Sequence, residues 1–513
     1  MKYPIGIQNF EDLRFNNYIY IDKTKYIYKL ANEGKYYFLS RPRRFGKSLL
    51  ISTMEAYFQG KRELFDGLAI QQEEKEWNSY PILHIDLNTA NFREEDSLYT
   101  LLNDYLCQWE SVYGTRESET TLALRFKGIV ARIAQKEGKG VVILIDEYDK
   151  PILQTLQHPE LQDKHRNMLK AFYSVLKTQD KYIKFAFITG VTKFGKVSVF
   201  SDLNNLTDIS MDNRYVAICG LTEEELASNF KQGIEELAKT YGDTIEETIA
   251  KLRERYDGYH FEEHTIGIYN PFSVLNAMSR KQYKDYWFET GTPTFLVDLL
   301  KMHNYRLQDL TTERVSGDVI NSIDSMSTNP IPAIYQSGYL TITGYDERFK
   351  KYLLGFPNKE VEEGFINFLL PLYSSAGTDS PFIVDEFVQD VETGKPEQFM
   401  QRMKAFFADT SYQVVGNAEL YFQNVMYLVF KMMGFYTQVE RPTSDGRIDA
   451  IIQTADYIYI IECKLDGSAD EALKQIATNH YDAPFAMDKR KLIKIGINFS
   501  SETRGVESWK TEE

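Results

Sequence analysis

Short apolar runs alternate with amphipathic stretches along the first 220 residues of the chain. Four runs are mostly apolar and rich in aromatic or β-branched residues, as buried strands are: 36–39, 82–87, 141–145 and 185–189. A fifth candidate strand covers 215–219, and helical periodicity lies between the runs, as at 48–58 and 120–135. Strands that alternate with helices predict an α/β fold with a parallel sheet covered on both faces.

The pattern becomes mainly helical after residue 220. Thr222 and Glu225 have the spacing of a helical capping box, and helix-like stretches continue to about residue 380 with irregular segments between them. Turn-forming residues gather at 374–381, where we expect a domain boundary.

The C-terminal region combines helices with strands. Helical patterns reach Gly434, two strand-like runs follow at 447–453 and 457–463, and a helix then leads to a third run at 492–498. The chain is therefore predicted to contain three regions, which are an α/β domain at 1–220, a mainly helical region at 221–380 and a small α/β domain at 381–513.

Composition and charge narrow the classes of function. The chain has 513 residues, 43% of them hydrophobic, and a net charge of −15, which argues against a general coat for nucleic acid or a polybasic membrane anchor. The N-terminus lacks the pattern of a secretory signal, and no apolar run is long enough to span a membrane. Three widely spaced cysteines fit a reducing compartment, so we expect a cytoplasmic protein with no membrane partner.

A basic, glycine-containing loop follows the first predicted strand. Gly46, Lys47 and Ser48 match the end of the phosphate-loop pattern GxxxxGK[ST], but Arg41 occupies the position of its first glycine. Backbone N–H groups at a helix start attract phosphate oxygens, and the loop's lysine and serine suit the β- and γ-phosphates and Mg²⁺ of ATP. The alternative interpretation is a basic turn that caps an ordinary helix.

An acidic pair at the end of a later strand complements this loop. Asp146 and Glu147 follow the apolar run 141–145, and an acid at the carboxyl end of a parallel strand lies where α/β sheets bind ligands. We expect Asp146 to hold Mg²⁺ and Glu147 to polarise the attacking water. Thr189, at the end of the next strand, is the candidate γ-phosphate sensor, with Thr192 as the alternative.

The joint occurrence of these elements predicts an ATP site. Its candidate residues are Arg43, Arg44, Phe45, Gly46, Lys47, Ser48, Leu49, Asp146 and Thr189, with Glu147 as the catalytic carboxylate.

A second group of charged residues lies on the C-terminal hairpin. A tight turn between positions 455 and 456 pairs residues whose numbers add up to 911, which places Asp449 opposite Glu462. Lys464 shares the face of Glu462 because strand side chains repeat every two residues. Facing carboxylates repel unless a cation lies between them, and oxygen ligands suit Mg²⁺ or Mn²⁺, which can activate water for phosphodiester cleavage. The alternative is an exposed hairpin on which Lys464 and Arg447 offset the acids.

Two further residues could complete that site. Glu419, on a predicted helix at 417–433, would add a carboxylate to the metal ligands, and Gln475 lies on the helix after the hairpin. Spacing alone is equally compatible with solvated helix residues.

These motifs resemble the AAA-ATPase-like proteins common in gut bacteria. The resemblance rests on the segments 22–24, 41–48, 146–151, 189–194, 204–209, 256–259 and 269–273. The loop form Arg-Pro-Arg-Arg-Phe-Gly-Lys-Ser is usual in that family. The segments 446–449 and 462–464 resemble the PD-(D/E)XK nuclease domain that ends these proteins.

The resemblance implies a P-loop ATPase domain of the additional-strand class, with sheet order 5-1-4-3-2, followed by a restriction-endonuclease-like domain. It assigns Asp449, Glu462 and Lys464 to the nuclease core, Glu419 to the helix acid and Gln475 to the following helix. Ile448 departs from the superfamily pattern, in which Pro often precedes the acid.

The function expected from the sequence is that of an ATPase coupled to a metal-dependent nuclease that acts on DNA or another nucleic acid, in defence, repair or mobile-element biology. The alternative is a nucleotide-switched signalling or scaffold protein with an inactive nuclease-like domain. The sequence identifies no arginine finger, so an oligomer is compatible with it but not implied.

Overall fold

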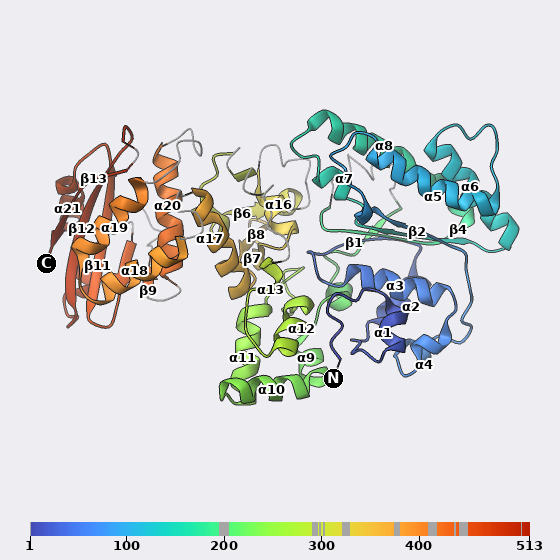
Figure 1. Cartoon of the computed structure of the whole chain (residues 1–513), viewed down its shortest axis with the longest axis horizontal. Helices are drawn as coiled ribbons and strands as arrows, with labels where there is room; N and C mark the ends of the chain where they lie inside the picture. Colours follow the sequence, from blue (N-terminus) through green and yellow to red (C-terminus); the bar gives the residue numbers. More distant parts are fainter. Residues whose placement is uncertain are drawn as a thin grey trace. The chain divides into compact units, whose positions relative to one another are not determined.

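The structure is a computed structural model of the whole chain (Figure 1). It describes residues 2–193, 205–289, 296, 299–300, 303–320, 329–373, 380–408, 418–434, 438–440, 450–503 and 505–513. The chain divides into two compact units, Met1–Gly291 with Thr312–Val361, and Thr292–Thr311 with Glu362–Glu513. The three-region division at residues 220 and 380 remains a prediction.

A five-stranded parallel sheet forms the centre of the first unit. Its strands are β1 (Tyr36–Ser40), β2 (Ile82–Asp86), β3 (Val141–Asp146), β4 (Ile183–Gly190) and β5 (Thr207–Asp208). They lie in the order β2-β3-β4-β1-β5, and every neighbouring pair is parallel. The predicted fold class and the order 5-1-4-3-2 are therefore confirmed.

Helices cover both faces of this sheet, which explains why β3 is buried along its whole length. Figure 1 shows one face covered by α1 (Phe10–Phe15), α2 (Thr24–Glu33), α3 (Lys47–Phe58) and α4 (Ile70–Glu73), and the other by α5 (Ser97–Tyr113), α6 (Leu122–Glu137) and α8 (Pro159–Thr178). Short elements between them are η1 (Arg62–Phe65), η2 (Leu87–Thr89), α7 (Lys150–Leu153) and η3 (Asp180–Tyr182).

The covering helices follow the expected helical period. α6 buries Phe126, Ile129 and Ile133, which share one face of a helix. Phe126 stacks on Phe172 of α8 with ring centroids 4.4 Å apart. This face therefore joins the two helices above the sheet.

The fifth strand is not the one predicted from the sequence. Residues 213–218 form the 3-10 helix η4 (Asn213–Ile218), and β5 lies just before it. Asp212 caps η4 by accepting a hydrogen bond from the Arg214 N–H at 2.9 Å. Tyr215 and Ile218 are buried as a strand's residues would be, and a short apolar run does not distinguish the two conformations.

A helical cluster follows the sheet. Its members are α9 (Glu223–Asn229), α10 (Lys231–Tyr241), α11 (Ile245–Tyr256), α12 (Pro271–Arg280) and α13 (Tyr286–Glu289). Both hydrogen bonds of the predicted capping box at the start of α9 are present: the Glu225 N–H donates to Thr222 Oγ1 at 3.1 Å, and the Thr222 N–H donates to Glu225 Oε2 at 2.9 Å. Phe230, Leu252 and Met278 form part of the shared core.

A small antiparallel sheet follows in the region predicted to be mainly helical. It has the order β6-β8-β7, with β6 (Arg314–Ser316), β7 (Thr341–Asp346) and β8 (Lys351–Gly355). The short helices α15 (Gly317–Ile320) and α16 (Ile331–Gln336) lie between β6 and β7. A register shift between Ile342 and Gly344 interrupts the strict alternation that would have marked β7 as a strand.

The second unit contains another five-stranded sheet, in the order β13-β12-β11-β10-β9. Its strands are β9 (Gln438–Glu440), β10 (Ala450–Gln453), β11 (Tyr457–Leu465), β12 (Lys491–Ser500) and β13 (Gly505–Glu512). Its other elements are η5 (Leu307–Thr311), α17 (Lys359–Tyr373, which begins in the first unit), α18 (Ser380–Glu392), α19 (Pro396–Ala408), α20 (Ala418–Met433), α21 (Ala469–Thr478) and η8 (Ala483–Phe485).

The predicted hairpin and the strand after it are β10, β11 and β12, whereas β9 and β13 were not predicted. β11 and β12 are parallel, so the chain needs a crossover between them, and α21 supplies it. Most of the turn-rich segment predicted as a boundary, 374–379, lies outside the described residues.

One buried carboxyl group joins three parts of the first unit. Glu360, at the start of α17, accepts hydrogen bonds from Ser273 Oγ at 3.0 Å and from the Trp287 N–H at 2.8 Å. Burial raises the pKa of Glu360 to about 8, so the group is mainly protonated at neutral pH.

The Glu360→Gln variant should change how stability depends on pH. Because folding raises the pKa of Glu360, the folded protein holds this proton more tightly, and wild-type unfolding free energy falls as pH rises towards 8. The variant keeps both accepted hydrogen bonds but has no proton to lose. Its unfolding free energy should therefore rise relative to that of the wild type by up to about 1.4 kcal/mol for each unit by which the pH rises towards 8. Calorimetry of both proteins, with the exposed Glu235→Gln as control, measures this, and parallel pH dependences would contradict it.

Candidate functional site

The ends of β1, β3 and β4 lie at one edge of the first sheet, because their strands are parallel. The basic loop follows β1 and leads into α3, and Asp146 ends β3. Gly46 has φ +91° and Arg44 φ +67°, so the backbone turns sharply twice before the helix begins.

Lys47 meets the acidic strand end directly. Its side chain is 3% exposed, and its Nζ lies 3.3 Å from Glu147 Oε1. The same ammonium donates to the carbonyl oxygens of Arg41 at 3.1 Å and Pro42 at 3.3 Å. The loop is thus held around the lysine by carbonyls on one side and a carboxylate on the other.

Ser48 and Asp146 lie next to each other. Burial raises the pKa of Asp146, the negative charge of Glu147 raises it further, and a hydrogen bond with the Ser48 side chain lowers it. The Glu147 N–H donates to Asp146 Oδ1 at 3.0 Å, and Glu147 has a left-handed φ of +52°. The structure therefore brings together Lys47, Ser48, Asp146 and Glu147.

Thr189 is buried in β4 beside Leu39 of β1. Its hydroxyl has no hydrogen-bond partner among the residues that the structure describes. The hydroxyl of the alternative residue, Thr192, donates to Asp149 instead. Of the two candidate sensors, Thr189 is therefore the one whose hydroxyl makes no hydrogen bond to the described residues.

Arg41 is part of the packing around the loop. It is 1% exposed, and its guanidinium donates to Ser210 O at 2.8 Å and to Tyr215 O at 3.3 Å. It also lies 3.9 Å from the centre of the Phe261 ring. Burial lowers its pKa to about 10, which still leaves it charged. The side chain at the first-glycine position therefore braces the loop against the segments after β5 and α11.

The other loop residues divide into buried and exposed ones. Phe45 is buried, with its ring centroid 4.8 Å from that of Tyr259. Arg43 and Arg44 are exposed. The carbonyl of Arg43 accepts a hydrogen bond from Trp287 Nε1 at 3.0 Å, which ties the loop to α13.

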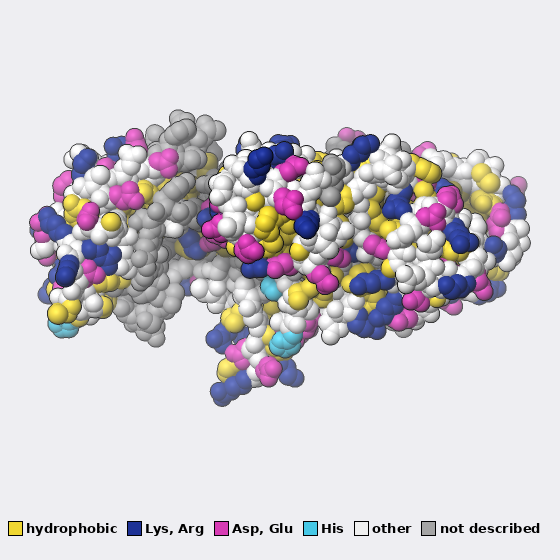
Figure 2. Space-filling model, turned by 90° about the horizontal axis from the view of Figure 1, so that it is seen from below, with side chains coloured by type: hydrophobic (Ala, Val, Ile, Leu, Met, Phe, Trp, Pro, Cys, Tyr) yellow, Lys and Arg dark blue, Asp and Glu magenta, His cyan; other side chains and the backbone are white. Residues whose placement is uncertain are grey.

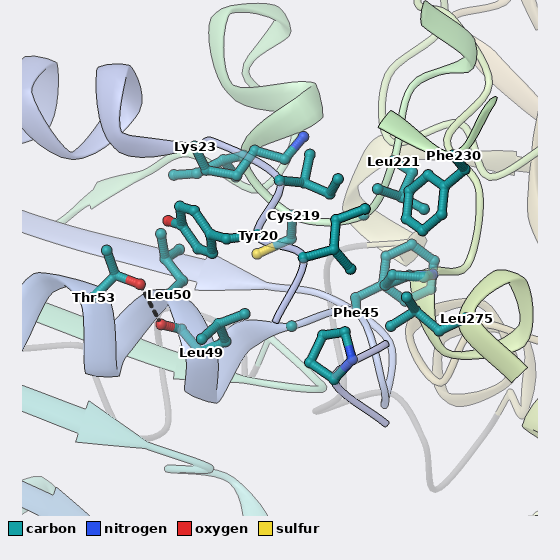
Figure 3. Close-up of a pocket in the computed structure, with 17 residues that line it drawn as sticks. Tyr20, Lys23, Phe45, Leu49, Leu50, Thr53, Cys219, Leu221, Phe230 and Leu275 are labelled. Carbon is teal, nitrogen blue, oxygen red and sulfur yellow. Dashed lines mark hydrogen bonds between the residues drawn. The ribbon is translucent and has the colours of Figure 1, made fainter. Parts of the chain in front are cut away.

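An apolar pocket, which the sequence did not reveal, adjoins Gly46 and Leu49 (Figure 3). The lining comes from α3 and the loop before it, from α12, and from segments at residues 4, 19–23, 218–221 and 230. It includes Ile19, Ile21, Leu49, Leu50, Cys219, Leu221, Phe230 and Leu275. Because these positions are scattered through the sequence, no local pattern could have predicted the pocket.

The hairpin of the second unit has the predicted register. Its four described pairs, from Ala450 with Ile461 to Gln453 with Ile458, all add up to 911. Asp449 itself lies outside the described residues. Glu462 is buried, and Lys464 Nζ lies 3.3 Å from Glu462 Oε1 and hydrogen-bonds to Gln475 Oε1. Glu462, Lys464 and Gln475 thus lie together as expected.

The rest of the candidate metal site is not described. Glu419 falls within α20, but its side chain lies outside the described part. Within the described ranges, no group of three His, Cys, Asp or Glu side chains is arranged to hold a metal ion.

The surface charge and the hydropathy of the helices are the next features. On the face shown in Figure 2, Lys and Arg side chains are interspersed with Asp and Glu side chains. Among the helices in the described parts of the chain, none has both the length and the hydropathy to cross a bilayer.

Arg41→Gly would restore the GxxxxGK[ST] pattern, yet it should destabilise the first unit. The change removes a buried charged side chain and leaves the carbonyls of Ser210 and Tyr215 without their donor. It should lower the unfolding free energy by about 2 kcal/mol or more. Thermal unfolding of this variant, compared with the exposed Arg43→Gly, measures the effect. Equal melting temperatures for the two variants would show that the Arg41 side chain does not stabilise the first unit.

Comparisons with known proteins agree with this architecture. A family model described as "Predicted AAA-ATPase" matches residues 4–200, and one described as "PD-(D/E)XK nuclease superfamily" matches residues 417–509. A solved structure of the ORC2 protein of Aeropyrum pernix, in ADPNP–ADP complexes, covers 66% of this chain and 92% of its own at 10% identity. The TM-score of the match is 0.24.

A full-length relative completes the comparison. It is a protein of Azotobacter chroococcum mcd 1, described as an uncharacterized protein in the vnfD 5' region, and it is 33% identical over 526 residues. The match covers 100% of this chain and 99% of the relative. The chain belongs to the AAA-ATPase-like family and carries a C-terminal domain of the PD-(D/E)XK nuclease superfamily.

Proposed function

We propose that the first unit binds and hydrolyses ATP, and that this reaction controls a metal-dependent nuclease site in the second unit. The observation that carries the proposal is the meeting of Lys47 and Ser48 with Asp146 and Glu147 at one sheet edge. Residues about a hundred positions apart in the chain meet there, and their side chains supply the groups that a metal-bound triphosphate requires.

The loop and the pocket suit the two halves of the nucleotide. Lys47 would neutralise the β- and γ-phosphates, with Arg43 and Arg44 adding exposed positive charge nearby. The apolar pocket beside Gly46 and Leu49 would take the flat base. Its apolar lining excludes water, so it favours burial of the ring.

Ser48 and Asp146 form the candidate Mg²⁺ ligands, since a hydroxyl and a carboxylate oxygen already lie in contact. When bound, the ion supplies charge neutralisation on the β- and γ-phosphate oxygens.

Glu147 is the proposed catalytic residue. Its Oε1 lies 3.3 Å from Lys47 Nζ. When the phosphates take over Lys47, Glu147 is released to orient a water molecule and accept its proton as the water attacks the γ-phosphorus and the bond to ADP breaks. Thr189, whose hydroxyl lies at the end of β4, is the proposed γ-phosphate sensor.

The second unit supports a nuclease-like role acting on DNA or another nucleic acid. Asp449, Glu462 and Glu419 are the proposed ligands of Mg²⁺ or Mn²⁺, which when bound would activate water and neutralise the scissile phosphate. Lys464, held by Glu462 and Gln475, would position that water.

A nucleotide-switched scaffold with an inactive nuclease-like domain is the second candidate. The net charge of −15 favours it, because nucleic acid is repelled by an acidic protein.

Lys47→Ala should abolish ATP binding, whereas Glu147→Gln should bind ATP and lose roughly a hundredfold in kcat or more. The lysine contributes the charge that binds the phosphates, and the glutamate acts only on water. Binding of a fluorescent ATP analogue and phosphate release measure the two effects, with the exposed Lys25→Ala as control. Unchanged affinity in Lys47→Ala would show that the ATP site has been misplaced.

Glu462→Gln and Asp449→Ala should each abolish Mn²⁺-dependent cutting of plasmid or single-stranded DNA, because each removes a carboxylate from the proposed metal site. The exposed Glu502→Gln should cut like the wild type. A wild-type protein that binds DNA, cuts no nucleic acid with any metal tested and responds to ATP would favour the scaffold.

A further inference from the structure

A buried carboxylate that the proposed chemistry does not use lies three residues after Asp146. Asp149 is 0% exposed. Its Oδ2 accepts hydrogen bonds from the Val191 N–H at 3.1 Å and the Thr192 N–H at 2.6 Å, and also from the Thr192 hydroxyl. The residue therefore joins the acidic loop after β3 to the backbone just after β4.

Tyr148 adds two hydrogen bonds to this junction. The Tyr148 N–H donates to Thr189 O at 3.1 Å, and the Tyr148 hydroxyl donates to Thr192 O at 3.0 Å. A Cβ at Gly190 would lie 2.6 Å from Tyr148 Cδ1, so only glycine permits such a close approach. Residues 148 and 149 together fix the path of the chain from 189 to 192.

The junction lies next to the two groups proposed to act in hydrolysis. Glu147 directly precedes it and has a left-handed backbone, a conformation that persists in a non-glycine residue only when its surroundings hold it. Thr189 directly precedes Gly190. Loss of the Asp149 contacts would therefore release Glu147 and the end of β4 at the same time.

We propose that Asp149 is a positioning residue for ATP hydrolysis, which sets Glu147 and Thr189 in one fixed geometry through its bonds to Val191 and Thr192. The proposal rests on the ATPase function proposed above. It predicts that Asp149 acts mainly on kcat and leaves ATP affinity nearly unchanged, since its side chain accepts its hydrogen bonds from Val191 and Thr192.

The junction should also respond to pH. The charged and titratable groups that face Asp149 are Glu147 in its own loop, Lys47 of α3 and Tyr173 of α8. Burial and then the charge of Glu147 raise the pKa of Asp149 to about 6, against the lowering effect of the Thr192 hydrogen bonds. Protonation below that pH converts one acceptor oxygen into a donor that faces other donors, and so weakens the junction.

Asp149→Asn tests the proposal, because the amide keeps the shape but its neutral oxygen is a weaker acceptor than a carboxylate for the donors of Val191 and Thr192. We expect kcat for ATP to fall roughly tenfold or more, with the Kd of a fluorescent ATP analogue within about threefold of the wild type. The fall in wild-type kcat below about pH 6 should be absent from the variant.

The pair Thr192→Val and Thr192→Ser gives an independent answer if Asp149→Asn does not fold. Valine removes the hydroxyl donor and should lower kcat without changing the Kd of the ATP analogue. Serine keeps the hydroxyl and should give the kcat of the wild type. Wild-type kcat in Asp149→Asn, or equal kcat in the two Thr192 variants, would overturn the positioning role only. A wild-type protein that hydrolyses no ATP would overturn the ATPase function itself.

Discussion

The contact between the Lys47 ammonium and the Glu147 carboxylate is the constraint around which the first unit is arranged. A lysine that is almost fully buried needs compensation for its lost hydration, and two loop carbonyls and one carboxylate provide it. The arrangement requires that β1 and β3 end at the same edge, which the parallel order with β4 between them provides. The helices on both faces keep that edge fixed by burying the sheet.

Much of this organisation could be predicted from sequence because its signals are local. Apolar runs marked β1 to β4, and the turn near position 455 set the register that brings Glu462 and Lys464 to one face. Buried apolar character alone misassigned residues 215–219, because a 3-10 helix capped by Asp212 buries the same side chains as a strand. The strand β7 was missed because its register shift breaks the alternation.

The parts of the site that sequence could not predict depend on contacts between distant segments. Arg41 looked like a departure from a phosphate loop, and only its carbonyl partners, about 170 positions away, show what its side chain does. The apolar pocket is assembled from several separate segments with no common motif. The role proposed for Asp149 likewise rests on the backbone of Val191 and Thr192, which no spacing rule connects with it.

The hydrogen bond from Trp287 to the Arg43 carbonyl has a mechanical consequence. The backbone N–H of Trp287 bonds to Glu360, so this residue is held through its backbone as well as through its indole ring. A shift of the loop by a fraction of an ångström would stretch this bond or pull on α13 and on the start of α17. The tryptophan therefore couples the position of the loop before α3 to that of α13 and the start of α17.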